Sequence, residues 1–279
     1  MDRPVRPADS ASGGEAERIK EAYRWRRAQG LDETVWTDLD PRVHFMRFEV
    51  EREVLRALKG AGLADVGSLE VLDVGCGDGR FLRWLAELGV PPANLHGIDL
   101  LPFQVERARE LSPAMDVREG NAESLPYPDD SMDVVAAFTT LSAVLDPLMR
   151  ARVAAEMLRV VRPTGVVLCF DARSEKPGGE VAGRPYFRGL SRHTLARLFP
   201  GCRLEFRQLV LNLSLADRLA RLYTFGPWGI ARYKRRPQEQ SQPSVRYPLK
   251  FPYLVVEALK LFPFLHTHYL AIVRKDSPA

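Results

Sequence analysis

The sequence predicts an α/β protein with a doubly wound, mainly parallel sheet, and two observations carry this prediction. First, between residues 69 and 171 apolar runs of strand length alternate with runs of helix length. Such alternation calls for a parallel sheet covered by helices on both faces, and right-handed crossovers make that sheet doubly wound. Second, the glycine-rich turn VLDVGCGDGR (71–80) ends the first apolar run. A glycine turn at this place in an open α/β sheet is typical of nucleotide binding.

The individual elements follow from this alternation. The expected strands are 68–75, 94–100, 115–120, 132–138, 165–171, 202–213 and 267–274. The expected helices that follow the first strand are 80–89, 103–111, 147–161 and 191–199.

Two more helices are expected before the first strand. Residues 15–29 are predicted to form one helix that ends at Gly30. In residues 42–59, apolar residues recur at three- and four-residue steps, and Gly60 follows as a stop signal. The apolar stripe consists of Val43, Met46, Val50, Val54, Leu55 and Leu58.

The composition is that of an ordinary globular protein, with 46% apolar and 27% charged residues. The first residues lack the apolar core of a secretory signal, and no run reaches about 18 apolar residues, so neither a signal peptide nor a transmembrane span is expected. Cys76, Cys169 and Cys202 form no closely spaced pair. A disulfide or zinc framework is therefore not expected, and the reducing cytoplasm is the expected location.

Positive charge concentrates in the last part of the chain. The formal net charge is +4, whereas residues 230–279 hold nine Lys/Arg against three Asp/Glu, a net of +6. The densest cluster is RYKRR (232–236). A solvated loop is the plain interpretation, and a contact for an anionic substrate, a membrane headgroup or nucleic acid is the sharper one. Nucleic acid is disfavoured because no aromatic single-strand platform or zinc finger accompanies the cluster.

The glycine turn distinguishes two classes of cofactor. A dinucleotide turn follows G-x-G-x-x-G; Gly75 and Gly77 match it, but Arg80 stands where the third glycine belongs. Asp73 would also place a negative charge beside a pyrophosphate. The same carboxylate suits an ammonium or sulfonium group, and S-adenosylmethionine has both and no phosphate. An NAD-dependent oxidoreductase is therefore the disfavoured alternative.

The run LDVGCGDGR resembles motif I of the class I S-adenosylmethionine-dependent methyltransferases, [DE]-x-G-x-G-x-G, at Asp73, Gly75, Gly77 and Gly79. The resemblance, to the small-molecule type of this family, implies S-adenosylmethionine as cofactor. It implies that Asp73 holds the methionine amine, and that the turn at Gly75 and Gly77 lets the methionine part lie against the backbone. It also implies a Rossmann-like, doubly wound seven-stranded sheet whose last strand is antiparallel.

Asp99 ends the second expected strand, and a carboxylate there can accept both hydroxyls of a ribose. This feature is shared with NAD enzymes, so it supports an adenosine ribose and not one particular cofactor. The family resemblance places Leu100 against the adenine face and Gln104 of the next helix nearby.

Two later segments extend the resemblance, so that it covers residues 69–171. Residues 119–135 resemble the family's acidic loop after strand three, with Asn121 in place of the usual Asp. The Asn121 amide oxygen would accept from adenine N6, and the Ala122 N–H would donate to N1. Residues 157–171 resemble the R-x-L-x-P-G-G segment that leads into strand five.

The end of strand four is where the resemblance places the cofactor's methyl group. Many small-molecule family members carry histidine there, whereas this chain has FTTLS and no histidine. Phe138 and Thr139 are therefore interpreted as walls of the cofactor site. If the methyl acceptor is a hydroxyl or ammonium group, a base must remove its proton. The candidate bases are His193, Asp171 and His44.

The helix expected at residues 15–29 resembles the N-terminal helix that covers the cofactor in many small-molecule methyltransferases. A Tyr hydroxyl or an Arg guanidinium of such a helix meets the methionine carboxylate, and Arg suits the bidentate contact. Tyr23 and Arg27 lie four residues apart, on one helix face, and are assigned this role. A plain amphipathic surface helix is the alternative.

The chain is accordingly divided into a disordered tail (1–14), an N-terminal helical lid (15–60) and a methyltransferase domain (61–279). Within that domain, residues 213–265 form an insertion before the last strand, with aromatic and Leu residues around a basic middle. Three roles stay open for this insertion: gripping an apolar acceptor with an anionic part, resting peripherally on a membrane surface, or packing beneath a homodimer interface. Stable membrane insertion is not expected.

Together these patterns predict an enzyme that transfers a methyl group from S-adenosylmethionine to a small-molecule acceptor. A natural product, a glycan or a lipid-like intermediate is expected, in secondary metabolism, with O-methylation favoured over N- and C-methylation. Neither a metal nor a nucleic-acid partner is expected. The alternative is a non-catalytic partner subunit that binds S-adenosylmethionine. The missing histidine after strand four keeps this alternative open, while Asp73 and Asp99 argue against it.

Overall fold

A computed structural model describes residues 14–30, 41–174, 186–209 and 268–276. The chain divides into two compact units, one of Met1–Arg207 with Tyr269–Ala279 and one of Gln208–His268. The expected insertion at 213–265, its basic cluster and residues 1–13 of the expected tail lie outside the described residues. The roles assigned to them stay predictions.

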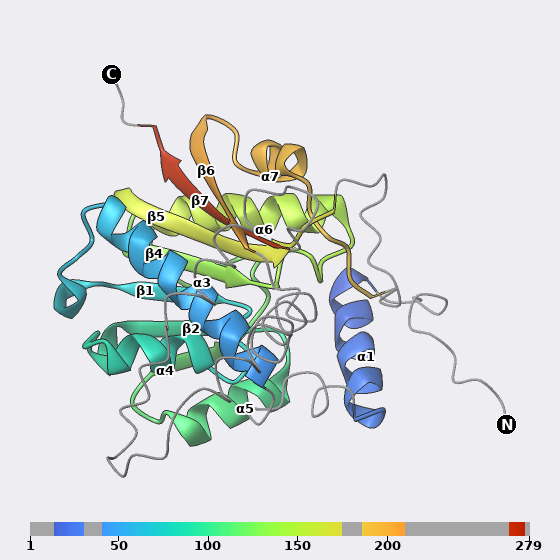
Figure 1. The fold of residues 1–279 in the computed structure, drawn as a ribbon. Coiled ribbons are helices and arrows are strands. Elements are labelled where there is room, and N and C mark those ends of the chain that lie inside the picture. The colour runs from blue at the N-terminus through green and yellow to red at the C-terminus, as the bar shows by residue number, and fades with distance from the viewer. Residues whose placement is uncertain (1–13, 31–40, 175–185, 210–267, 277–279) are drawn as a thin grey trace, which may run out of the picture. The chain divides into compact units, whose positions relative to one another are not determined.

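The chain folds around a seven-stranded sheet in the order β3-β2-β1-β4-β5-β7-β6, with β7 antiparallel (Figure 1). This confirms the predicted α/β, doubly wound, Rossmann-like architecture. The strands are β1 (Val71–Val74), β2 (Leu95–Asp99), β3 (Asp116–Glu119), β4 (Met132–Phe138), β5 (Val161–Ala172), β6 (Cys202–Leu209) and β7 (His268–Lys275).

Strand order reverses at β1, which pairs in parallel with both β2 and β4. Strands β3 and β5 extend the parallel part on the two sides, through pairs such as Asp99 with Glu119 and Phe138 with Phe170. In sheets of this kind, ligands bind beyond the carboxyl ends of the strands at the point of reversal. The glycine turn after β1 lies at that point.

Six α-helices are described around the sheet. They are α1 (Glu15–Ala28), α3 (Pro41–Gly60), α4 (Arg80–Glu87), α5 (Pro102–Leu111), α6 (Pro147–Val160) and α7 (Arg192–Leu198). Figure 1 shows α3, α4 and α5 on one face of the sheet and α6 on the other. Coverage of both faces explains why the central strands are almost entirely buried.

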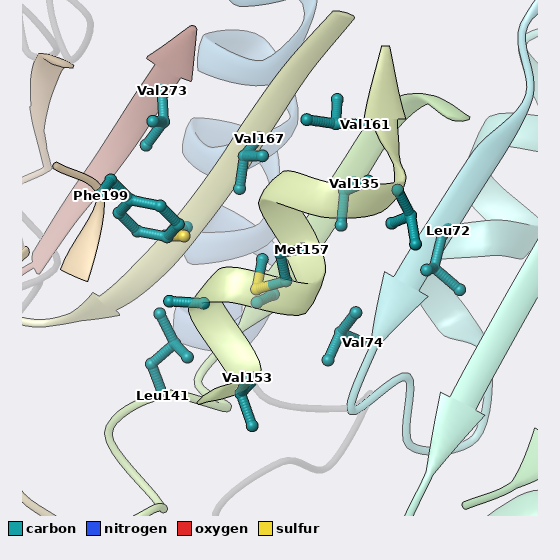
Figure 2. Packing of buried hydrophobic residues seen from close by; sticks show 14 of the residues in the cluster. Leu72, Val74, Val135, Leu141, Val153, Met157, Val161, Val167, Phe199 and Val273 are labelled. Carbon is teal, nitrogen blue, oxygen red and sulfur yellow. The ribbon is translucent and has the colours of Figure 1, made fainter. Parts of the chain in front are cut away.

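The main apolar core lies between α6 and the sheet (Figure 2). Met157 of α6 is fully buried in it together with Val74 of β1 and Val135 of β4. Ile19 of α1 and Phe199, just after α7, belong to the same cluster. Each such side chain stabilises the fold by about 1.5–3 kcal/mol when fully buried. The core therefore ties α1 to the face of the sheet that α6 covers.

Helix α3 departs from its prediction in two respects. Leu55 is 44% exposed, so the prediction that it joins the buried stripe is wrong. The buried positions include Val50, Val54 and Leu58, and Leu55 lies about 100° around the helix from Val54, on the solvent side. The helix also includes Gly60, and the left-handed residue that follows it is Gly62, with φ of +80°.

Candidate cofactor and acceptor site

The glycine turn joins β1 to α4 through three left-handed residues. Gly75, Gly77 and Gly79 have φ of +73°, +56° and +77°, a region that glycine enters without steric cost. A Cβ added to Gly75 would lie 2.7 Å from Cγ2 of Thr140, whereas one added to Gly77 would meet no atom of the described residues within 4 Å. The chain's own Thr140 thus fills the space beside Gly75, whereas the backbone of Gly77 is open. The contact of this turn with the methionine part stays a prediction.

Asp73 is a buried acid with an unsatisfied oxygen. Its side chain is 3% exposed, and Oδ1 has no hydrogen-bond partner among the described residues. Burial, together with the charges of Asp99 and Asp78, raises the pKa of Asp73 to about 8. A buried polar atom without a partner is unfavourable, and a cation beside it would supply the missing interaction. This environment fits the methionine ammonium of S-adenosylmethionine.

Asp99 at the end of β2 holds the turn as well as facing the site. Its Oδ2 accepts from the Gly77 N–H at 2.8 Å, and its Oδ1 accepts from the Leu101 N–H at 2.9 Å. Burial raises the pKa of Asp99, and these hydrogen bonds oppose the rise. Because a carboxylate has about four acceptor sites, two stay available for ribose hydroxyls. The sequence pointed to the ribose role but gave no sign that Asp99 fixes the glycine turn.

Asn121 shapes its own loop. Its Oδ1 accepts from the Glu123 N–H at 3.0 Å, and its Nδ2 donates to the Glu123 carboxylate at 2.9 Å. This is an Asx-type turn, which fixes the loop after β3. An adenine contact by Asn121 would use the second lone pair of Oδ1, and it stays a prediction.

Three residues assigned to the cofactor from separate segments border one core. Tyr23 of α1, Leu100 after β2 and Ala122 after β3 are partly buried and pack against the main apolar core. The guanidinium of Arg26 lies 4.7 Å from the ring centre of Tyr23. Because that core extends along much of the sheet, these contacts do not test the assignment of the three residues to the cofactor, which stays a prediction.

Arg27 and Gln104, also assigned to the cofactor, meet at a cavity of about 540 Å³. Its lining comes from α1, the glycine turn and α5: Arg27, Asp78, Phe103, Gln104, Glu106, Arg107 and Glu110. The Arg27 guanidinium lies 4.9 Å from the ring centre of Phe103. The cavity therefore places Arg27 beside the turn without showing what it binds.

The end of β4 is sterically constrained. Phe138 packs between Phe81 of α4 and Phe170 of β5, with ring centres 4.5 Å and 6.0 Å away. Thr139 has φ of +58°, which is rare for a β-branched residue, and its N–H donates to the Phe170 carbonyl at 2.6 Å. Strained residues of this kind persist where the surroundings fix them, often at functional sites. The role of Phe138 and Thr139 as cofactor walls stays a prediction.

Of the three candidate bases, Asp171 has the most distinctive surroundings. It lies near the end of β5, is 1% exposed, and its Oδ1 accepts from both the N–H and the hydroxyl of Ser142. Burial raises the pKa of Asp171 to about 7, although the Ser142 hydrogen bonds and the charge of Arg150 oppose the rise. His44 on α3 and His193 on α7 are exposed and line no part of the cavity just described.

Arg150 of α6 holds the β4–α6 loop (residues 139–146) by hydrogen bonds. The Arg150 Nε donates to the carbonyls of Leu141 and Val144, at 3.0 Å each, and the residue is only 8% exposed. Sequence reasoning did not single out Arg150. The available signal was a charged residue next to Met149, on the face of α6 that also carries Val153, Ala154 and Met157.

Helix α1 holds the same loop from the other side. Arg18 donates to the Ala143 carbonyl at 2.7 Å, and the Glu15 carboxylate accepts from the Leu145 N–H. The two side chains are also paired with each other, at 2.8 Å. Tyr23 and Arg27 were the α1 residues expected to matter. The contacts of the first helical turn were missed because they depend on which loop the helix meets.

The sheet order with an antiparallel β7, the glycine turn after β1 and the buried acid that ends β2 define the class I methyltransferase fold. Residues 72–169 match the model of a family described as a methyltransferase domain. This part of the chain is a class I S-adenosylmethionine-dependent methyltransferase domain, and S-adenosylmethionine is its cofactor.

Two curated relatives and one solved structure illustrate the likeness. Demethylmenaquinone methyltransferase of Lysinibacillus sphaericus is 35% identical over 123 residues, which cover 43% of this chain and 51% of that protein. Phthiotriol/phenolphthiotriol dimycocerosates methyltransferase of Mycobacterium tuberculosis is 35% identical over 120 residues, or 42% of each protein. The match thus spans about half or less of these relatives.

The solved structure is a crystal structure of an S-adenosylmethionine-dependent methyltransferase from Archaeoglobus fulgidus. It superposes with a TM-score of 0.53 at 15% identity, covering 89% of this chain and 99% of that one. At this identity the likeness shows the fold alone.

None of the described helices combines the length and apolarity needed to cross a bilayer. Nor do the described residues contain a group of three His, Cys, Asp or Glu side chains suited to a metal ion.

Proposed function

We propose that the protein transfers a methyl group from S-adenosylmethionine to a hydroxyl group of a small-molecule acceptor. The observation that carries the proposal is the buried, unpaired Oδ1 of Asp73 beside the open backbone of Gly77. A cation beside this acid would favour its ionised form and supply the interaction that Oδ1 lacks. When bound, S-adenosylmethionine supplies an activated methyl group.

The chain's own residues would act by positioning. Asp73 would hold the methionine ammonium, Asp99 the ribose hydroxyls, and Arg27 the methionine carboxylate. Asn121 and Ala122 would meet the adenine. Alignment of two reactants in a site closed to water can supply much of the rate enhancement of such a transfer.

The acceptor is proposed to be a natural product or a lipid-like intermediate of secondary metabolism. The support is that relatives matched over residues of the methyltransferase domain are named for demethylmenaquinone and for phthiotriol dimycocerosates. Cys76, Cys169 and Cys202 are free thiols, which supports a reducing cytoplasm.

The test of the cofactor site is Asp99→Ala, measured by titration calorimetry with S-adenosylmethionine. Loss of two hydrogen bonds to a charged group, at about 1.5–3 kcal/mol each, should weaken binding about 100-fold or more. Asp116→Ala is the matched control, since Asp116 begins β3 at the opposite end of the strand from the site. Unchanged affinity in Asp99→Ala would contradict the placement of the ribose.

The second candidate function, a subunit that binds S-adenosylmethionine without transferring its methyl group, rests on the absence of histidine in the FTTLS segment. A radiolabelled methyl-transfer assay against an extract of the source cells separates the two functions. Binding by calorimetry without label in any fraction would favour this second function and overturn the first.

A further inference from the structure

The two oxygens of Asp171 are in different states. Oδ1 accepts twice from Ser142, by its N–H at 3.2 Å and by its hydroxyl. Oδ2 is buried and has no hydrogen-bond partner among the described residues. An acid that served only to hold the β4–α6 loop would need Oδ1 alone, and leaving the second oxygen unpaired in the interior is unfavourable. Oδ2 therefore calls for a hydrogen-bond donor that the described chain does not provide.

The sheet separates Asp171 from the two acids that are assigned to the cofactor. Asp73 belongs to β1 and Asp99 to β2, whereas Asp171 belongs to β5, with β4 between β1 and β5. Phe138, which ends β4, pairs with Phe170, the residue before Asp171. With the cofactor held at β1 and β2, as in the proposed function, an acceptor over the ends of β4 and β5 would lie beside Asp171.

We propose that Asp171 is the catalytic base and that the hydroxyl group of the acceptor donates to Oδ2. This inference rests on the proposed function. In the transfer, the acceptor's O–H bond breaks and its proton goes to Oδ2. The freed electron pair forms the new bond to the methyl carbon, and the electron pair of the carbon–sulfur bond stays with sulfur. The carboxyl group later returns the proton to solvent.

The surroundings of Asp171 match this task. Burial lifts the pKa of the acid to about 7, where a base accepts a proton readily and is still partly ionised at neutral pH. Two groups oppose the lift, the Ser142 hydrogen bonds and the positive charge of Arg150. Ser142 thus stabilises the ionised form through Oδ1 and leaves Oδ2 for the acceptor.

The experiment compares Asp171→Asn and Ser142→Ala with the wild-type chain. The probe is the small-molecule fraction of an extract of the source cells, supplied with S-adenosylmethionine labelled with ¹³C in the methyl group. Asp171→Asn keeps an acceptor for Ser142 but cannot take a proton, so the rate should fall by about 10²–10⁴-fold. Its affinity for S-adenosylmethionine, measured by calorimetry, should stay within about twofold of wild type.

Ser142→Ala tests whether Asp171 acts as a base, because a purely structural role of Asp171 would leave the pH–rate profile unchanged. Removing a hydrogen bond to the ionised carboxylate raises its pKa, so the acid limb of the pH–rate profile should move to higher pH. The matched control is Ser112→Ala, which changes another buried serine, at the C-terminal end of α5. This variant should leave the acid limb of the pH–rate profile in place. An infrared titration of the carboxyl band that Asp171→Asn removes should show the same shift without any turnover.

Each outcome decides the inference. A labelled methyl carbon with the ¹³C shift of a methoxy group, lost in Asp171→Asn, supports it. A methyl group on carbon or nitrogen, a wild-type rate in Asp171→Asn, or a pH–rate profile and a carboxyl band that do not shift in Ser142→Ala overturns it while leaving methyl transfer itself intact. Binding without transfer by the wild-type chain would overturn the proposed function, and this inference with it.

Discussion

At the scale of single residues, Gly75 and Gly77 differ in what occupies the space beside them. Both are left-handed, so alanine at either position strains the backbone by about 1–2 kcal/mol. At Gly75 the new methyl would also collide with Thr140, whose hydroxyl donates to the Val74 carbonyl at 2.9 Å. At Gly77 it would enter open space. The same substitution should therefore have different consequences at the two positions.

We expect Gly75→Ala to lose more stability than Gly77→Ala, and Gly77→Ala to lose affinity for S-adenosylmethionine beyond what its stability explains. Urea denaturation gives the free energy of unfolding of each variant, and calorimetry gives the affinity. The backbone near Gly77 would not be part of the cofactor site if Gly77→Ala bound S-adenosylmethionine as tightly as wild type.

The sequence allowed the acids of the site to be predicted, but not their burial or hydrogen bonds. Asp73, Asp99 and Asp171 were recognisable because they lie within or at the end of apolar runs of strand length, and parallel strands end at a common edge of the sheet. That Asp73 and Asp171 each keep an unpaired oxygen depends on what packs around them in three dimensions. The exposure of His193 and His44 has the same origin, since the residue type alone does not decide which side of a helix faces solvent.

At the scale of elements, α1 reaches the β4–α6 loop through its first turn. Arg18 is 8% exposed and donates to the Ala143 carbonyl. We expect Arg18→Ala to weaken this docking by about 1–3 kcal/mol, because it leaves a buried carbonyl unpaired. Faster amide hydrogen exchange across residues 15–28 and a lower kcat/KM for the acceptor should follow.

Lys20→Ala is the control on the same helix. Lys20 forms a half-exposed pair with Glu17 at 3.2 Å, which is worth little. Equal exchange rates in Arg18→Ala and Lys20→Ala would mean that the Arg18 contact does not hold α1 in place.

The element order was predictable because strand and helix periods differ, but contacts between elements were not. The strand–helix alternation predicted five strands of a parallel, doubly wound sheet, and these strands are found in the order β3-β2-β1-β4-β5. No periodicity indicates that Arg150 turns inward to hold a loop, or that α1 meets that loop with Glu15. Both contacts join segments far apart in the chain, so only the fold reveals them.

At the scale of the whole molecule, buried acids with raised pKa values make stability depend on pH. Asp73 has a pKa of about 8 and Asp171 of about 7 in the folded chain, against an ordinary value of 3.8. At a pH between the ordinary pKa and the raised pKa of each acid, the folded chain holds a proton that the unfolded chain has released. Stability therefore falls as pH rises from about 4 to about 8. The loss comes from ionising buried carboxylates, at a desolvation cost that the charge of Arg150 near Asp171 offsets only in part.

We expect the free energy of unfolding without cofactor to drop by a few kcal/mol between pH 5 and pH 8.5, since one pKa unit corresponds to about 1.4 kcal/mol. Asp73→Asn removes the largest of these shifts and should flatten the curve and stabilise the free chain above about pH 8. S-adenosylmethionine should stabilise wild type more at pH 8 than at pH 6, because its ammonium group pairs with ionised Asp73. Urea denaturation across this range checks both. A wild-type curve as flat as that of Asp73→Asn would mean that Asp73 is ionised in the free chain and already has a cationic partner.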